Sequence, residues 1–201
     1  RGRRSEIITK VISGTGDVVQ KVGEYTFTLP PTAFWQAHHQ ALSTYSDLIT
    51  QWVTGGQYGV EPVGWDLYGG VGALVPALHH ALGNNSHIHS VESARIMATS
   101  GQVTFGDDVH FHIGLVGNLV DTLPQPEVVV LDPPRVGAGA DVVTRIAARK
   151  PQRVIHIGCD PATFATDIRA WSQAGYHLSD IVVVNAFPGT HHFETLGLLQ
   201  P

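Results

Sequence analysis

The 201-residue sequence has one cysteine, and only 14% of its residues are charged. A single thiol cannot form an internal disulfide or supply the roughly four thiolates that an iron–sulfur cluster or a zinc–thiolate site requires. No apolar run reaches the roughly 18 residues of a membrane span, and no signal-peptide pattern opens the chain. The lone thiol fits a reducing compartment, so we expect a soluble, cytoplasmic globular protein with no membrane partner.

Positive charge is also scarce, and it is unevenly distributed. Lys and Arg number 12 against 17 Asp and Glu, which gives a formal net charge of −5. Residues 22–94 contain no Lys or Arg, whereas six of the 12 fall between Arg135 and Arg169. The acidic balance argues weakly against a nucleic-acid partner, because phosphate contacts need cations. The clustered cations could form a local basic face, although ordinary solvated helix surfaces explain them equally well.

Histidine is abundant by contrast, with 12 residues. Pairs such as His87-x-His89 and His110-x-His112 place both rings on one face of a strand. No carboxylate or third ligand follows at a recognisable interval, so we predict no metal site and expect most histidines at the surface or the core edge.

Strand-like and helix-like segments alternate along the chain. Strands are expected at 63–68, 87–91, 127–131, 153–158 and 179–186, and helices at 37–53, 73–82, 141–149 and 161–174. Apolar strands without alternation, separated by helices, are typical of a parallel sheet covered on both faces. The predicted fold class is therefore α/β, with a doubly wound, mainly parallel sheet. Two short β segments, 6–11 and 25–29, are expected around a turn at 14–17, and 93–121 shows no clean period.

A glycine turn follows the first strand of the predicted sheet. It contains Gly70 and Gly72, and Glu92 closes the next strand about 20 residues later. Glycines let the backbone approach a ligand, and the acidic residue can accept both ribose hydroxyls. The spacing fits a dinucleotide or S-adenosylmethionine. The later glycine that serves a dinucleotide's pyrophosphate is not present, which favours S-adenosylmethionine.

Three chemically capable residues follow other strands. Asp132 precedes two prolines that make its turn rigid, which suits a planar ligand but also suits a simple strand end. Cys159 lies where a strand meets a helix, and helix N-terminal amides can lower the pKa of a thiol. An inert buried cysteine is the alternative. Glu194 is expected to be a loop carboxylate.

Five blocks in this order resemble the S-adenosylmethionine-dependent RNA 5-methyluridine (uracil-5-) methyltransferases, over about Thr26 to the C-terminus. The blocks are Phe34-Trp35-Gln36, Asp66-Leu67-Tyr68-Gly69-Gly70-Val71-Gly72, Leu131-Asp132-Pro133-Pro134-Arg135-Val136-Gly137, Gly158-Cys159-Asp160-Pro161-Ala162-Thr163 and Phe187-Pro188-Gly189-Thr190-His191-His192-Phe193-Glu194. The resemblance implies the Rossmann-like fold of these enzymes, S-adenosylmethionine as cofactor and a structured tRNA or rRNA as substrate. It implies Cys159 as nucleophile and Glu194 as base. The implied cofactor contacts are Gln36, Tyr68, Gly70, Gly72, Glu92 and Asp132.

The implied reaction explains these residue types. A thiolate adds to carbon 6 of uracil so that carbon 5 can take a methyl group, and a base then removes the proton of carbon 5. The uridine must be unstacked, which predicts base flipping or a loop substrate. Four positions depart from the family's pattern and bear on rate and substrate choice: Gly158, Asp160, Asn185 and Gly189.

Family members carry an N-terminal RNA-binding β-barrel and a central domain. This chain starts with Arg1 rather than methionine. We therefore expect the natural protein to begin earlier. Residues 1–30 would be a remnant of the preceding part and 31–201 the catalytic domain, with RNA held largely by the part outside this sequence.

Two alternatives stay open. An amino-directed methyltransferase could use the Asp132-Pro133-Pro134 turn around a planar nitrogen, in which case Cys159 would be incidental. A non-catalytic module that binds S-adenosylmethionine or RNA could share the same fold.

Overall fold

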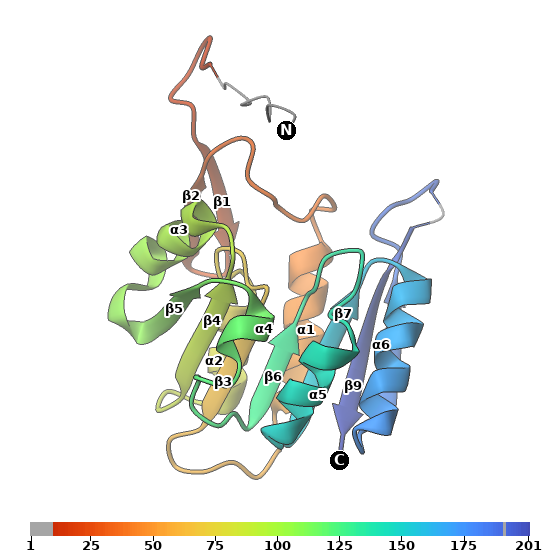
Figure 1. The fold of residues 1–201 in the computed structure, drawn as a ribbon. Coiled ribbons are helices and arrows are strands. Elements are labelled where there is room, and N and C mark those ends of the chain that lie inside the picture. Colours follow the sequence, from red (N-terminus) through yellow and green to blue (C-terminus); the bar gives the residue numbers. More distant parts are fainter. Residues whose placement is uncertain (1–9, 191) are drawn as a thin grey trace, which may run out of the picture.

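The computed structural model describes residues 10–190 and 192–201, which are built around a seven-stranded sheet (Figure 1). The strand order is β5-β4-β3-β6-β7-β9-β8. The strands are β3 (Val63–Leu67), β4 (His87–Glu92), β5 (Val109–Ile113), β6 (Val128–Leu131), β7 (Arg153–Gly158), β8 (His177–Val184) and β9 (Glu194–Gln200). The first five in spatial order pair in parallel, and β9 is antiparallel to both β7 and β8. The predicted fold class is confirmed.

Helices cover both faces of the sheet (Figure 1). They are α1 (Ala41–Val53), α2 (Val75–Leu82), α3 (Arg95–Phe105), α4 (Val116–Leu119), α5 (Ala140–Ala148) and α6 (Pro161–Gln173). Val128 and Val130 of β6 pack with α1, α2 and α3, whereas Val129 and Leu131 pack with α4, α5 and α6. Burial on both faces explains why β6 is apolar at every position.

A two-stranded hairpin, β1 (Val18–Val22) and β2 (Tyr25–Leu29), precedes the sheet and packs on α3. Phe27 is fully buried, with its ring 5.8 Å from that of Phe105. The predicted β segment 25–29 is confirmed. The segment expected at 6–11 is wrong where it can be judged, since Lys10 and Val11 lie in no strand, and its other residues fall outside the described ones. The hairpin instead turns at Gly23, which has φ of +57°.

Other differences concern segment ends and one overlooked strand. α1 begins at Ala41, and β8 covers His177–Val184, two residues before the predicted range. Residues 93–121 hold α3, β5 and α4. β9 was not predicted. A Cβ at Gly197 in its middle would lie 2.8 Å from Leu178 and 3.1 Å from Phe164, so the glycine lets β8 and α6 pack closely against this strand.

None of the helices in the described part of the chain has the length and apolar character to span a bilayer.

Candidate active site

The predicted site residues follow strands whose carboxyl ends share one edge of the sheet. Because β3, β4, β6 and β7 run in parallel, the residues after them meet at that edge. Tyr68 follows β3 with φ of +60°, and Gly70 and Gly72 have φ of +59° and +81°. The turn after β3 therefore folds back on itself, which brings its backbone to the mouth of a pocket.

This pocket gathers four of the six residues predicted to contact a cofactor. Gln36, Tyr68, Gly70 and Asp132 line it, together with apolar side chains that include Met97. Gln36 Nε2 donates a hydrogen bond of 3.2 Å to Asp132 Oδ2, which joins the segment before α1 to the end of β6.

The other two predicted contacts lie just outside the pocket lining. Glu92 accepts hydrogen bonds from the amides of Gly70 and Ala94, at 3.1 and 2.5 Å. Its carboxylate therefore supports the glycine turn from behind. A Cβ at Gly72 would lie 3.0 Å from both Phe105 and Phe111, so this glycine permits close packing of α3 and β5.

Two carboxylates at this edge have raised pKa values. Burial, followed by the charge of Glu194, raises the pKa of Asp132 to about 7, against the hydrogen bond from Gln36. Burial also raises the pKa of Asp66 to about 7, although Ser90 Oγ donates to its Oδ2 at 2.9 Å. Asp66 is 2% exposed and lines the same pocket. The sequence placed Asp66 in a motif without assigning it a role.

Cys159 lies at the end of β7, directly before Asp160, the N-cap of α6. Asp160 Oδ1 accepts from the amides of Ala162 and Thr163, both at 3.0 Å. These amides are the groups that were expected to favour a thiolate. Burial raises the pKa of Cys159, as do the charges of Glu194 and Asp132, and the charge of Arg135 lowers it. The expectation of a lowered thiol pKa is therefore wrong, because burial and the charges of Glu194 and Asp132 outweigh the groups that lower it.

Glu194 is the first residue of β9, paired with Val184 of β8, and is only 4% exposed. The expectation of a loop carboxylate is therefore wrong. Burial raises the pKa of Glu194 to about 7, and its Oε2 has no hydrogen-bond partner among the described residues. Its charge acts on both Cys159 and Asp132, so the ends of β6 and β7 and the start of β9 converge on one site.

Sequence analysis missed Tyr45 of α1. Its side chain is fully buried, and its hydroxyl has no hydrogen-bond partner in the described part of the chain. Burial raises its pKa, and so do the charges of Glu194, Asp132 and Cys159. In the sequence Tyr45 is one apolar position of an amphipathic helix, and no local signal distinguishes it.

One departure from the family pattern has a packing reason. A Cβ at Gly158 would lie 2.9 Å from the ring of Phe164 in α6. The glycine therefore lets the first turns of α6 approach the end of β7. The approach sets how Cys159 leaves the strand.

The histidine pairs of β4 and β5 stack on one another. The rings of His89 and His110 lie 4.9 Å apart, and those of His89 and His112 lie 5.2 Å apart. Within residues 10–190 and 192–201, no cluster of three or more His, Cys, Asp or Glu side chains has a geometry that could hold a metal ion.

Sequence comparison relates the chain to RNA methyltransferases. The profile of the tRNA (uracil-5-)-methyltransferase family matches residues 86–201. An RNA methyltransferase of Corynebacterium efficiens is 52% identical over 98% of this chain and 48% of its own length. One of Bifidobacterium longum is 34% identical over 96% of this chain and 45% of its own length. The chain thus spans about half the length of these curated relatives.

Structural comparison gives the same fold. The tRNA (uracil-54, C5)-methyltransferase of Pyrococcus abyssi, solved in complex with S-adenosyl-L-homocysteine, superposes with a TM-score of 0.76. The match covers 93% of this chain and 45% of that one at 20% sequence identity, which indicates a shared fold. Taken with the profile match, these observations show that the chain belongs to the tRNA (uracil-5-)-methyltransferase family.

Proposed function

We propose that this chain is the catalytic part of an RNA methyltransferase that transfers a methyl group from S-adenosylmethionine to carbon 5 of a uridine in tRNA or rRNA. The convergence of Cys159, Asp132 and Glu194 at one edge of the sheet carries the proposal. A nucleophile and a base from distant parts of the chain are the two groups that this reaction requires.

The pocket beside these residues fits S-adenosylmethionine chemically. Its apolar wall, which includes Met97, suits an adenine ring or a methyl group, and the glycine turn brings backbone close to a ligand. Asp132 and Glu92 supply carboxylates for a cationic ligand and for ribose hydroxyls. When bound, this cofactor supplies an electrophilic methyl group on a positively charged sulfur.

The chain's own residues would carry the remaining steps. The thiolate of Cys159 adds to carbon 6 of the uracil, so an S–C6 bond forms and the C5–C6 π electrons pass into an enolate. Carbon 5 then accepts the methyl group, whose bond to the cofactor's sulfur would break and leave its electron pair on that sulfur. Glu194 takes the proton of carbon 5, and the electrons of that C–H bond re-form the C5–C6 double bond and expel the thiolate.

The electrostatics of the site suit this sequence of steps. With a pKa of about 7, Glu194 is divided between its acid and base forms near neutral pH, the condition under which a general base works best. The thiol of Cys159 is a weak acid in the free chain, because burial, Glu194 and Asp132 all raise its pKa. A cationic ligand beside Asp132 would offset that repulsion and favour the thiolate when the cofactor is in place.

Replacing the nucleophile tests the proposal directly. Methyl transfer from labelled S-adenosylmethionine to transcribed tRNA and rRNA fragments is measured for the protein and for its Cys159→Ala variant. We expect 5-methyluridine from the wild type and none from Cys159→Ala. Cofactor binding by the variant, measured by calorimetry, controls for folding.

The same assay separates the alternatives. Product on an amino group that survives Cys159→Ala would support an amino-directed methyltransferase. Cofactor binding without methyl transfer by the wild type would support a non-catalytic module.

A further inference from the structure

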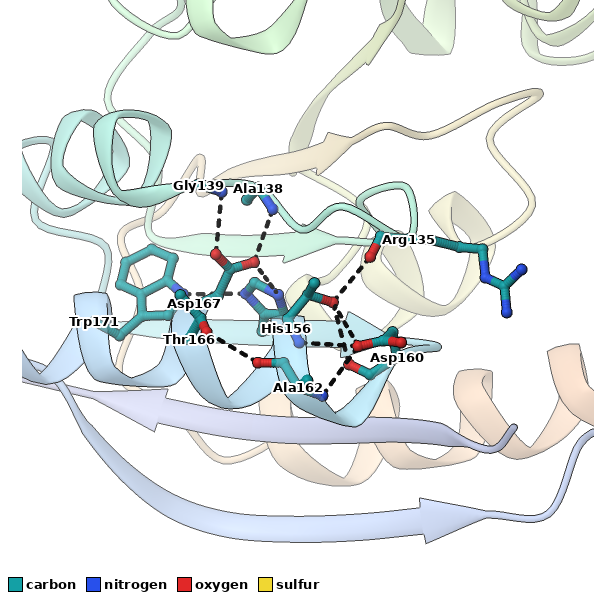
Figure 2. A network of polar contacts seen from close by, with 10 residues as sticks. Arg135, Ala138, Gly139, His156, Asp160, Ala162, Thr166, Asp167 and Trp171 are labelled. Atoms are coloured by element: carbon teal, nitrogen blue, oxygen red, sulfur yellow. Dashed lines mark hydrogen bonds and ion pairs between the residues drawn. The ribbon is translucent and has the colours of Figure 1, made fainter. Parts of the chain in front are cut away.

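A buried polar network connects β7 and α6 with the loop that follows β6 (Figure 2). Its central side chains, His156, Asp167 and Trp171, are 1%, 2% and 0% exposed. Polar groups this deeply buried are destabilising unless they are paired. The pairing shows which parts of the protein this network holds together.

The chemistry of the side chains fixes which group donates each hydrogen bond of the network. Trp171 Nε1 lies 3.1 Å from His156 Nδ1. An indole nitrogen can only donate, so Nδ1 accepts, and the proton of the neutral ring lies on Nε2. Nε2 lies 3.4 Å from Asp167 Oδ2. Trp171 therefore selects the tautomer that directs an N–H of His156 toward Asp167.

Asp167 also accepts hydrogen bonds from the loop. Its Oδ2 accepts from the amide of Ala138 at 2.7 Å, and its Oδ1 accepts from that of Gly139 at 3.0 Å (Figure 2). Burial alone would raise the pKa of Asp167, but the nearby ring of His156 and hydrogen bonds from the two amides lower it, so the group is ionised. Hydrogen bonds to a carboxylate are roughly twice as strong as neutral ones.

Gly137 shows how closely the loop approaches Asp167. Its φ is +81°, and a Cβ there would lie 2.7 Å from Asp167 Oδ2. A second link lies nearer the start of the loop, where Thr163 Oγ1 donates to the carbonyl of Arg135 at 2.9 Å. The loop that starts at Asp132 is therefore attached to α6 at two points.

The elements joined in this way carry the reacting groups. Asp132 and Arg135 belong to the loop, Cys159 directly precedes the N-cap of α6, and His156 lies on β7, the strand that Cys159 follows. We propose that Asp167 is a positioning residue that clamps loop 132–139 onto α6, so that Arg135 keeps its place beside Cys159. The clamp takes its catalytic meaning from the proposed function, but the arrangement can be measured without methyl transfer.

The pKa of the Cys159 thiol depends on where Arg135 lies. Burial, Glu194 and Asp132 raise the pKa of Cys159, and Arg135 is the side chain whose charge lowers it. Asp132 is held separately, because its amide donates to the carbonyl of Leu67 at 3.2 Å and its carboxylate accepts from Gln36. A released loop would therefore withdraw Arg135 and leave Asp132 in place, and the pKa of Cys159 would rise. Loss of the negative charge of Asp167, acting through space, would have the opposite sign and lower the pKa. The direction of the shift therefore distinguishes positioning from a direct charge effect.

The experiment measures the rate of alkylation of Cys159 by iodoacetamide as a function of pH. Cys159 is the sole cysteine of the chain, so the signal has one source. The variants are Asp167→Asn, which cannot accept from both amides, Thr163→Val, which releases the Arg135 carbonyl, and Arg135→Gln. Asp141→Asn is the matched control, because Asp141 is an exposed carboxylate of α5 that contacts Arg145.

We expect Asp167→Asn and Thr163→Val to move the midpoint of the alkylation profile upward by about half a unit to one unit, as Arg135→Gln does. Asp141→Asn should coincide with wild type. In an Arg135→Gln background, Asp167→Asn should add no further shift, because both changes remove the same interaction.

A folded Asp167→Asn variant whose midpoint is unchanged or lower would overturn the clamp. If thermal unfolding shows that Asp167→Asn does not fold, Thr163→Val decides by the same criterion. A wild-type chain that methylates no uridine while the variants show these shifts would contradict the proposed function and leave the clamp standing.

Discussion

Replacing Glu194 by Gln should make Cys159 more reactive and the enzyme inactive. The carboxylate of Glu194 raises the pKa of Cys159, after the larger effect of burial. Its removal therefore favours the thiolate. The same substitution removes the base that the proposed mechanism needs, so thiol reactivity and methyl transfer should change in opposite directions.

The size of the effect depends on the ionisation of Glu194 itself. A neighbouring carboxylate shifts a pKa by on the order of one unit, which is about a tenfold change in thiolate fraction. Because burial raises the pKa of Glu194 to about 7, it is mostly neutral at pH 6 and ionised at pH 8. The alkylation rates of Glu194→Gln and wild type should therefore agree near pH 6 and differ by about tenfold at pH 8. Methyl transfer should fall by at least about a hundredfold.

The assay is iodoacetamide alkylation between pH 6 and pH 9, followed by mass spectrometry, beside methyl transfer to RNA at pH 8. Glu61→Gln is the control, because Glu61 is an exposed carboxylate before β3. Equal alkylation rates at pH 8, or a slower rate in Glu194→Gln, would refute the reasoning about the site's charge.

Three further predictions concern other groups. Asp132→Asn should weaken binding of S-adenosylmethionine by about tenfold, as calorimetry can measure. In the wild type the affinity should rise as pH increases through 7, where Asp132 ionises, and the variant should lose this rise. An unchanged affinity would contradict the role of Asp132. Burial, with the charges of His110, His112 and His87, lowers the pKa of His89 to about 4, so the unfolded chain takes up a proton between pH 6.5 and 4 that the folded chain refuses. The contribution of His89 to the free energy of unfolding should therefore be constant above about pH 6.5 and fall by at most about 3 kcal/mol toward pH 4. The difference between wild type and His89→Asn in urea titrations should show this slope. With a net charge of −5, the chain should bind S-adenosylmethionine but bind RNA weakly, and tight, salt-sensitive RNA binding would contradict this.

The parallel part of the sheet could be predicted because its strands carry their own signal. Val128–Leu131 is apolar at every position, because two of its side chains are buried on one face of the sheet and the other two on the opposite face. Such a run, ended by a rigid turn at Asp132, predicts a central strand from local sequence alone.

α3 could not be predicted, because its exposed and buried faces have the wrong composition. Ile96 and Val103 are 58% and 81% exposed, whereas Ala98 is buried and Gly101 contacts the ring of Phe111. Small residues face the sheet where the helix lies close to it. Apolar residues are thus found on both faces, and the segment shows no clean apolar period.

Most of the proposed site was recognised from motifs, but its electrostatics were not. Glu194 is buried because β9 lies inside the sheet, and local sequence does not reveal this strand order. That burial raises the pKa of Glu194. Asp160 occupies the helix amides that were expected to help Cys159. Tyr45 joins the site only because α1 packs under the ends of distant strands. Each of these features depends on contacts between segments far apart in the chain.

The central claim, that Cys159 becomes covalently attached to uridine during methyl transfer, has a direct test. RNA that contains 5-fluorouridine is incubated with S-adenosylmethionine and this protein, and the products are digested and analysed by mass spectrometry. Fluorine at carbon 5 cannot be removed as a proton, so the adduct should persist on the peptide that contains Cys159 and be missing in Cys159→Ala. Methylation of ordinary uridine without any such adduct, or an adduct that survives in Cys159→Ala, would contradict the mechanism.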